Sequence, residues 1–261
     1  MTMQPIRAHE FPILEYDPTV DAIIDIDLEQ DRHPQMPEHC VICFFRDVID
    51  HFLEAGLLTR LHTVKSEMLE HPVYLYQIGD QKVALLHQAV GAPLAVYLLE
   101  ECIGMGARKF IACGGAGVLD RSIAMGHLLV PTAAVRDEGT SYHYLPPSRE
   151  VTPSMAAVQA IETVLQRHKI DYLLTKTWTT DAIFRETRAK VAMRRAEGCL
   201  AVEMEAASMF AVAQFRNVTL GQILYGGDNL DGDEWDGRDW MSNWSVREKL
   251  IQLAAEACLE L

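Results

Sequence analysis

The sequence predicts a single α/β domain, and three observations support that prediction. The chain has 261 residues, of which 49% are hydrophobic and 23% charged, so it is long enough to bury a sizeable core. From residue 39 onward, short apolar runs typical of buried strands alternate with segments of helical spacing. Nothing in 39–261 has the composition of a linker between domains. This alternation favours one α/β domain over 39–261.

The first 38 residues have a different character. They are rich in proline and acidic residues and show little periodicity. We therefore expect 1–38 to form an N-terminal arm that packs on the body of the domain or on a neighbouring subunit.

The first elements of the domain follow from their apolar spacing. "CVICFF" (40–45) predicts a short buried strand. "RDVIDHFLEAGLL" (46–58) predicts a helix that ends near Gly56. "VYLYQIGDQKVALLHQAV" (73–90) predicts two strands joined by a turn at Gly79-Asp80.

The rest of the chain continues the alternation. A helix is expected over 91–107, with Pro93 in its first turn, and the strand over 109–117 runs into a glycine turn. Further strands are expected at 126–135, 171–181, 199–205 and 220–228, and further helices at 153–168, 186–198, 206–216 and 244–260. A polar loop is expected over 228–240.

Composition excludes several classes of function. A net charge of −14 disfavours a nucleic-acid backbone as partner, because there is no excess of cations to displace phosphate counterions. No leader and no long apolar span is recognisable, so we expect a cytoplasmic protein without a membrane partner. The six cysteines lie mostly in apolar runs, where a free thiol behaves as a small hydrophobe. We expect no metal site and no cofactor.

The segment "AVEMEAASMFAVA" (201–213) places two carboxylates in an otherwise apolar run. Residues two apart share a face on an extended strand but not on a helix, so Glu203 and Glu205 converge only if the helix begins at Ala206. The pair would then lie at the carboxyl end of a strand, where open α/β sheets bind ligands. The alternative is that one glutamate caps the helix while the other is solvated.

Three other segments accompany "VEMEAA" (202–207) in a fixed order. They are "GGAG" (114–117), "GHLLVP" (126–131) and "GGDN" (226–229). With this set, residues 39–260 resemble the nucleoside phosphorylase/nucleosidase family, and "VEMEAA" is the most specific element. The resemblance implies a three-layer α/β/α sandwich with a mixed, partly barrel-like central sheet. It also implies a homo-oligomer, either a dimer or a hexamer.

The resemblance assigns roles to the carboxylate segment in cleavage of an N-glycosidic bond. Glu205 would accept hydrogen bonds from the 2′- and 3′-hydroxyls of the ribose and stabilise the developing oxocarbenium ion. Met204 would pack against the sugar face, and Glu203 would support the same site. Asp228 matches an aspartate that protonates or hydrogen-bonds the purine at N7, which is general acid catalysis. Alternatively, Asp228 only begins a turn.

The base-binding and phosphate-binding residues match the family less well. Phe184 is expected to stack on the base. Phosphorolytic members carry "GDPxxR" and an arginine before the glycine turn, whereas this chain has "CFFRD" (43–47) and Ala112. Arg46, Gly114 and Gly115 therefore remain as the candidate anion site.

Three functions stay open at this point. The first is a pentosyltransferase that cleaves a nucleoside, with a purine favoured as base and inorganic phosphate as nucleophile. The second is a hydrolytic nucleosidase, which the loss of the phosphate arginine favours. The third is a catalytically weak module that binds nucleosides.

Overall fold

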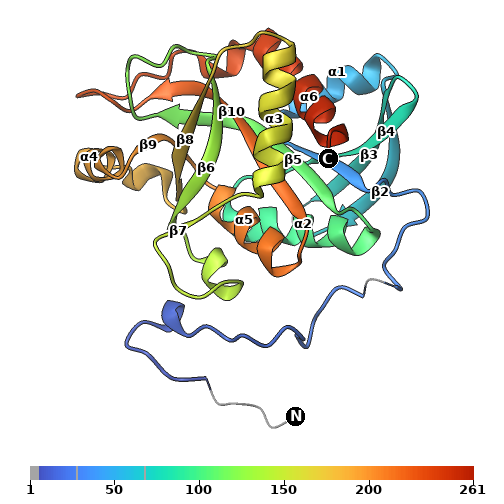
Figure 1. The fold of residues 1–261 in the computed structure, drawn as a ribbon, viewed down its shortest axis with the longest axis horizontal. Helices are drawn as coiled ribbons and strands as arrows, with labels where there is room; N and C mark the ends of the chain where they lie inside the picture. Colours follow the sequence, from blue (N-terminus) through green and yellow to red (C-terminus); the bar gives the residue numbers. More distant parts are fainter. Residues whose placement is uncertain (1–5, 28, 68) are drawn as a thin grey trace.

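The computed structural model describes residues 6–27, 29–67 and 69–261. In this part of the chain, a mixed β-sheet lies between two layers of helices (Figure 1). None of the helices described there combines the length and the apolar composition that crossing a membrane requires.

Ten strands form one sheet in the described residues. They are β1 (His39–Cys43), β2 (Leu58–Lys65), β3 (Glu70–Ile78), β4 (Gln81–His87), β5 (Lys109–Val118), β6 (Leu128–Asp137), β7 (Glu150–Val151), β8 (Tyr172–Thr180), β9 (Cys199–Glu203) and β10 (Thr219–Asn229). The helices are α1 (Arg46–Glu54), α2 (Ala92–Met105), α3 (Met155–Arg167), α4 (Arg188–Ala196), α5 (Ala206–Phe215) and α6 (Trp244–Leu259). Short 3-10 helices include Ile183–Arg185 and Trp240–Ser242.

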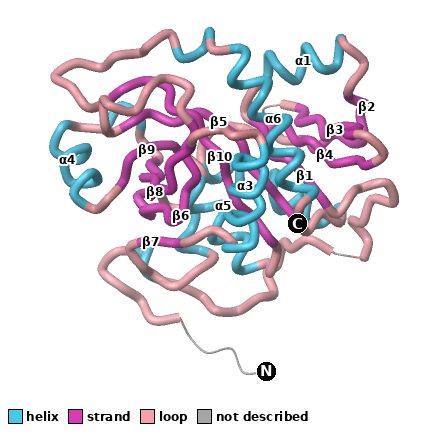
Figure 2. The backbone as a smooth tube through the Cα atoms, turned by 45° about the horizontal axis from the view of Figure 1, so that its top comes forward, coloured by secondary structure: helices cyan, strands magenta, loops and turns pink. Residues whose placement is uncertain are grey.

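Half of the sheet closes on itself. β5 pairs with β10, β10 with β6, β6 with β8, β8 with β9, and β9 returns to β5. From β5 the sheet extends through β1 and β4 to β3 and β2, and the short strand β7 pairs with β6. Figure 2 shows β2, β3 and β4 on one side of the molecule and β6, β8 and β9 on the other. The expected mixed, partly barrel-like sheet is therefore confirmed.

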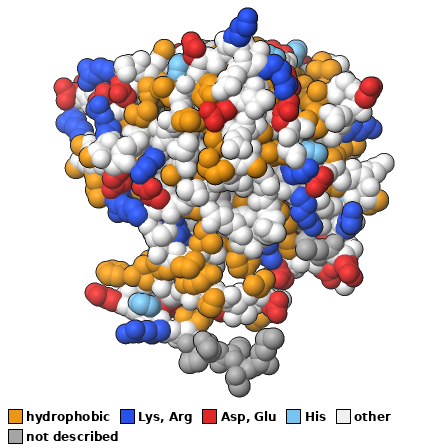
Figure 3. Space-filling view, in the orientation of Figure 1, with side chains coloured by type: hydrophobic (Ala, Val, Ile, Leu, Met, Phe, Trp, Pro, Cys, Tyr) orange, Lys and Arg blue, Asp and Glu red, His pale blue; other side chains and the backbone are white. Residues whose placement is uncertain are grey.

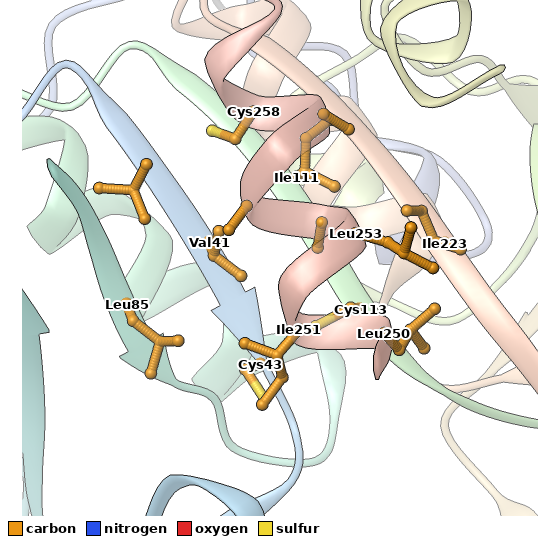
Figure 4. Packing of buried hydrophobic residues seen from close by; sticks show 14 of the residues in the cluster. Val41, Cys43, Leu85, Ile111, Cys113, Ile223, Leu250, Ile251, Leu253 and Cys258 are labelled. Carbon is orange, nitrogen blue, oxygen red and sulfur yellow. The ribbon is translucent and has the colours of Figure 1, made fainter. Parts of the chain in front are cut away.

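Each face of the sheet is covered by helices, which gives the expected three layers. One apolar cluster joins α1, α3 and α6 to the sheet, and Figure 4 shows α6 packed over β1 and β5 through Leu250, Ile251 and Cys258. A second cluster joins α2 and α5 to the opposite face. Because β1, β5 and β10 are parallel, their carboxyl ends meet at one edge, between these layers.

The N-terminal arm runs in extended form along the outside of the body (Figure 1). Asp25 forms an ion pair with Arg216 at 2.7 Å, and the His33 N–H donates to the Met105 carbonyl at 3.0 Å. Several apolar side chains of the arm remain exposed, among them Phe11, Ile23 and Ile24, and Figure 3 shows apolar atoms gathered there. Residues 1–5 and 28 of the expected arm lie outside the described residues. Its packing on a neighbouring subunit stays a prediction.

One strand was not predicted, and two local expectations were wrong. β2 was not foreseen, because its side chains are mostly exposed or half-buried and give no clear alternation. The strand β5 does not end in a glycine turn but continues through Gly114–Gly117 to Val118. The chain bends at Met204 rather than staying extended, since β9 ends at Glu203 and α5 begins at Ala206.

Candidate active site

A cavity of about 660 Å³ opens where the carboxyl ends of β1, β5, β9 and β10 meet. It brings together most of the residues singled out in the sequence. These are Arg46, Gly114, Gly115, Glu203, Met204, Glu205 and Asp228.

Glu203 is the last residue of β9, shortly before α5, and is buried. Its Oε2 accepts the backbone N–H groups of Glu205 and Ala206 at 2.8 and 2.5 Å, so it caps the helix. Its Oε1 accepts a hydrogen bond from the Thr179 hydroxyl at 2.6 Å. Burial raises the pKa of Glu203, and these donors oppose that effect. The alternative of a helix cap therefore holds for Glu203, but Glu205 is not solvated.

Glu205 is also buried, yet it has fewer partners. The Gly91 N–H donates to its Oε1 at 2.5 Å, and Gly91 lies directly before α2, which aims this donor at the cavity. Burial, followed by repulsion from Glu203, raises the pKa of Glu205 to about 8. The two carboxyl groups thus differ in role: protein donors occupy both oxygens of Glu203, whereas Glu205 retains capacity to accept hydrogen bonds from a ligand.

This raised pKa predicts how stability depends on pH. The unfolded carboxyl titrates near ~4.3 and the folded one at about 8, so between these values the folded state holds a proton that the unfolded state has released. Raising the pH therefore destabilises the wild type, and E205Q removes this contribution. We expect the free energy of unfolding of the wild type to fall relative to E205Q across this window. Urea unfolding at a series of pH values checks this, and parallel curves for the two proteins would contradict it.

Asp228 lies in β10 rather than in a turn. The pairing of β10 with β5 shifts register between Gly226 and Asn229, an irregularity of the kind that re-aims side chains near active sites. The Trp235 indole N–H donates to Asp228 Oδ2 at 2.7 Å. A side chain at Gly117 would place its Cβ 3.4 Å from Asp228 Oδ1 and 2.5 Å from Leu230, so only glycine leaves this space open.

Glu186 was not singled out in the sequence. It lines the cavity with Asp228, and no described residue forms a hydrogen bond or ion pair with its side chain. Burial, followed by the charge of Asp228, raises the pKa of Glu186 to about 7. The Glu186 carboxyl group therefore exchanges its proton near neutral pH.

The base-stacking candidate Phe184 lies in a neighbouring cavity, also of about 660 Å³. That cavity shares Ile183, Glu186, Asp228 and Trp240 with the first one. The Phe184 ring is 96% exposed, whereas Ile183 lines both cavities. In this conformation Ile183 is better placed than Phe184 to contact a base.

The candidate anion site contains two arginines, one of them unexpected. Arg46 lines the cavity, and its Nε forms a 2.8 Å ion pair with Asp50 on α1. Arg247, from the first turn of α6, lines the same cavity and forms two short contacts with Asp47. Among the described residues that line the cavity, each of these two arginines is thus paired with one aspartate.

Three residues that line the cavity, Arg247, Glu186 and Gln222, carry little signal in the sequence. Arg247 is 200 residues from its partner Asp47, and Glu186 lies in an irregular loop without periodicity. Gln222 also lines the cavity, and its buried Oε1 has no hydrogen-bond partner among the described residues. An orphaned polar group of this kind is visible only in three dimensions.

Two further polar residues of the segment 181–188 have structural partners. Asp181 accepts the Gly139 N–H at 2.9 Å, and the Arg188 guanidinium donates to the Asp233 carbonyl. Among the described residues, no group of three or more His, Cys, Asp or Glu side chains is arranged to hold a metal ion.

The chain resembles curated proteins over part of its length. A guanosine phosphorylase of Halorubrum lacusprofundi is 28% identical over 141 residues, which cover 54% of this chain and 58% of that protein. A uridine phosphorylase of Treponema pallidum is 28% identical over 166 residues, or 59% of this chain and 64% of that protein. The matched regions thus span less than two thirds of these relatives.

Solved structures establish the fold over more of the chain. A uridine phosphorylase from Vibrio fischeri superimposes with a TM-score of 0.72 at 21% identity and covers 87% of this chain and 94% of its own. A purine nucleoside phosphorylase from Toxoplasma gondii gives a TM-score of 0.72 at 18% identity and covers 85% and 90%. The family description "Phosphorylase superfamily" matches residues 38–260, and the chain therefore belongs to that superfamily.

Proposed function

We propose that this protein cleaves the N-glycosidic bond of a purine nucleoside, with inorganic phosphate as the nucleophile. One observation carries the proposal: the Glu203–Glu205 segment and Asp228 line the same cavity, although Asp228 lies 23 positions after Glu205 in the chain. The named curated relatives, a guanosine phosphorylase and a uridine phosphorylase, support this class of reaction.

The sugar end of the cavity is suited to a developing positive charge. The ribose hydroxyls donate hydrogen bonds to Glu205 and so favour its ionised form. As the glycosidic bond lengthens, the sugar gains positive charge, which the buried carboxylate stabilises more strongly than water would. Met204 provides an apolar surface beside these polar groups.

The base end is suited to a leaving group that needs a proton. The departing purine gains electrons, and protonation or hydrogen bonding at N7 makes it a better leaving group. Asp228 is fixed by the Trp235 indole N–H, and Glu186 lies beside it with a pKa of about 7. This pair supplies the proton or hydrogen bond to the base.

Hydrolysis is the second candidate, and one observation favours it. Arg46 and Arg247 are both paired with aspartates, so the cavity presents no unmatched cation from the described residues. Water is neutral, so its binding as a nucleophile needs no unmatched cation.

Phosphate dependence separates the two reactions. Purified protein is incubated with inosine, guanosine, adenosine or uridine, with and without phosphate, and the sugar product is identified. We expect ribose 1-phosphate, with turnover that falls to background when phosphate is omitted. Free ribose at equal rates in both buffers would establish hydrolysis instead, and absence of cleavage for all four would leave a nucleoside-binding protein.

A further inference from the structure

We propose that Arg247 is the residue that holds the phosphate co-substrate, and that Asp47 occupies its guanidinium when phosphate is absent. The inference rests on the phosphorolytic function proposed above. It accounts for the anion site of a chain that has neither of the two phosphate arginines of the family pattern, having "CFFRD" (43–47) and Ala112 instead.

Arg247 is held rigidly at the edge of the cavity. It is 8% exposed, and its guanidinium lies 4.9 Å above the ring of Phe45. Its Nη1 donates to the Met241 carbonyl at 3.1 Å. Its Nε is buried and has no partner among the described residues. A buried guanidinium with an unused donor is suited to a planar, multidentate contact with an oxyanion.

A continuous set of contacts joins Arg247 to the glycines of β5. The Phe45 ring beneath the guanidinium lies 5.9 Å from the Tyr225 ring, centroid to centroid. Tyr225 in turn lies against Gly115, where an added Cβ would be 3.2 Å from its ring. Arg247, Gly114 and Gly115 thus line one cavity and are linked through these two aromatic rings.

The Asp47 carboxylate binds the Arg247 guanidinium in the way that a phosphate oxyanion would. Its Oδ2 and Oδ1 lie 2.7 and 2.6 Å from the two terminal nitrogens of Arg247. The Asp47 side chain is 45% exposed, whereas the Arg247 side chain is 10% exposed. The carboxylate can therefore move into water while the arginine stays in place. Replacing it with phosphate exchanges one anion for another and leaves no buried charge unpaired.

Arg46 is less suited to this task. Its side chain is 66% exposed, and its pair with Asp50 joins successive turns of α1 at the surface. Contacts of such exposed charges are weak because water screens them. We assign Arg46 an auxiliary part at most.

The experiment measures phosphate affinity in variants of the full chain. R247Q, R247K and D47N are compared with R60Q, which removes an exposed arginine on β2 outside the cavity. We expect R247Q to raise the KM for phosphate by about 10- to 100-fold, with R247K intermediate and the nucleoside KM nearly unchanged. D47N should lower the KM for phosphate, because it removes the competing anion. R60Q should behave as wild type.

Thermal unfolding with and without phosphate, in the absence of nucleoside, provides a readout independent of turnover. D47N leaves Arg247 unpaired, so phosphate should raise its melting temperature more than that of the wild type, an effect that a purely structural ion pair would not produce. Phosphate-dependent turnover with an unchanged phosphate KM in R247Q and R247K would overturn the inference and leave the proposed function intact. Absence of phosphate binding to the wild type would overturn both.

The phosphate group could also belong to a nucleotide substrate, and one arm of the experiment separates this case. Inosine 5′-monophosphate is offered without inorganic phosphate. If the Arg247 variants raise the KM for the nucleotide but not for inorganic phosphate, the assignment to the co-substrate is wrong.

Discussion

Replacing Glu205 by Gln lowers kcat for nucleoside cleavage by about 10²- to 10³-fold, the loss expected when one preorganised electrostatic group is removed. Gln has nearly the same size as Glu, and its carbonyl can still accept the Gly91 N–H that Glu205 Oε1 accepts in the structure. It cannot, however, carry the negative charge that opposes the charge of the oxocarbenium ion. Because that charge matters most in the transition state, kcat should fall far more than the nucleoside KM rises. Steady-state kinetics on the best purine nucleoside measure both quantities.

The matched control for E205Q is E54Q. Glu54 is an exposed carboxylate at the end of α1 and does not line the cavity, so its loss should leave kcat and KM unchanged. If E205Q kept the wild-type kcat, Glu205 would have no part in the chemical step. If KM rose while kcat stayed at the wild-type value, Glu205 would bind the sugar without favouring its transition state.

The placement of Glu203 and Glu205 in the cavity was predictable because a local rule determines it. Residues 203 and 205 flank one position at a strand end, and an apolar helix follows directly. Such a segment places both carboxyl groups at the carboxyl edge of the sheet, and the structure has them there, lining one cavity. The prediction was wrong in one local detail, because the chain bends at Met204 instead of staying extended. Both carboxyl groups still line the cavity, since Glu203 accepts the N–H of Ala206 at the start of the helix that follows the bend.

The rest of the site depends on packing between distant segments. Arg247 reaches the cavity only because α6 crosses β1 and β5, an arrangement that follows from the shared core of Figure 4 and not from any spacing in the chain. Glu186 gains its raised pKa from burial beside Asp228, and burial of a loop residue leaves no periodic signal. The strand β2 was not predicted because most of its side chains are exposed or half-buried on both faces, so its sequence shows no apolar alternation.

Replacing Asp228 by Asn separates catalysis at the base from catalysis at the sugar. Asn keeps the size of the side chain, but it can neither donate a carboxylic proton nor carry charge. The partner of Trp235 remains, because the Asn carbonyl can accept the indole N–H that Asp228 Oδ2 accepts at 2.7 Å. We expect kcat for inosine and guanosine to fall by about 10²- to 10⁴-fold, which is the usual contribution of a general acid.

The sharper measurement varies the leaving group. p-Nitrophenyl β-D-ribofuranoside releases an anion that is stable without a proton, so D228N should cleave it nearly as well as the wild type does. E205Q should lose activity on both substrates, because both pass through the same charged sugar. Opposite responses of the two variants to the leaving group would locate acid catalysis at Asp228 and charge stabilisation at Glu205. If D228N lost equal activity on both substrates, Asp228 would act on the sugar or on the shape of the cavity, and Glu186 would remain as the group that protonates the base.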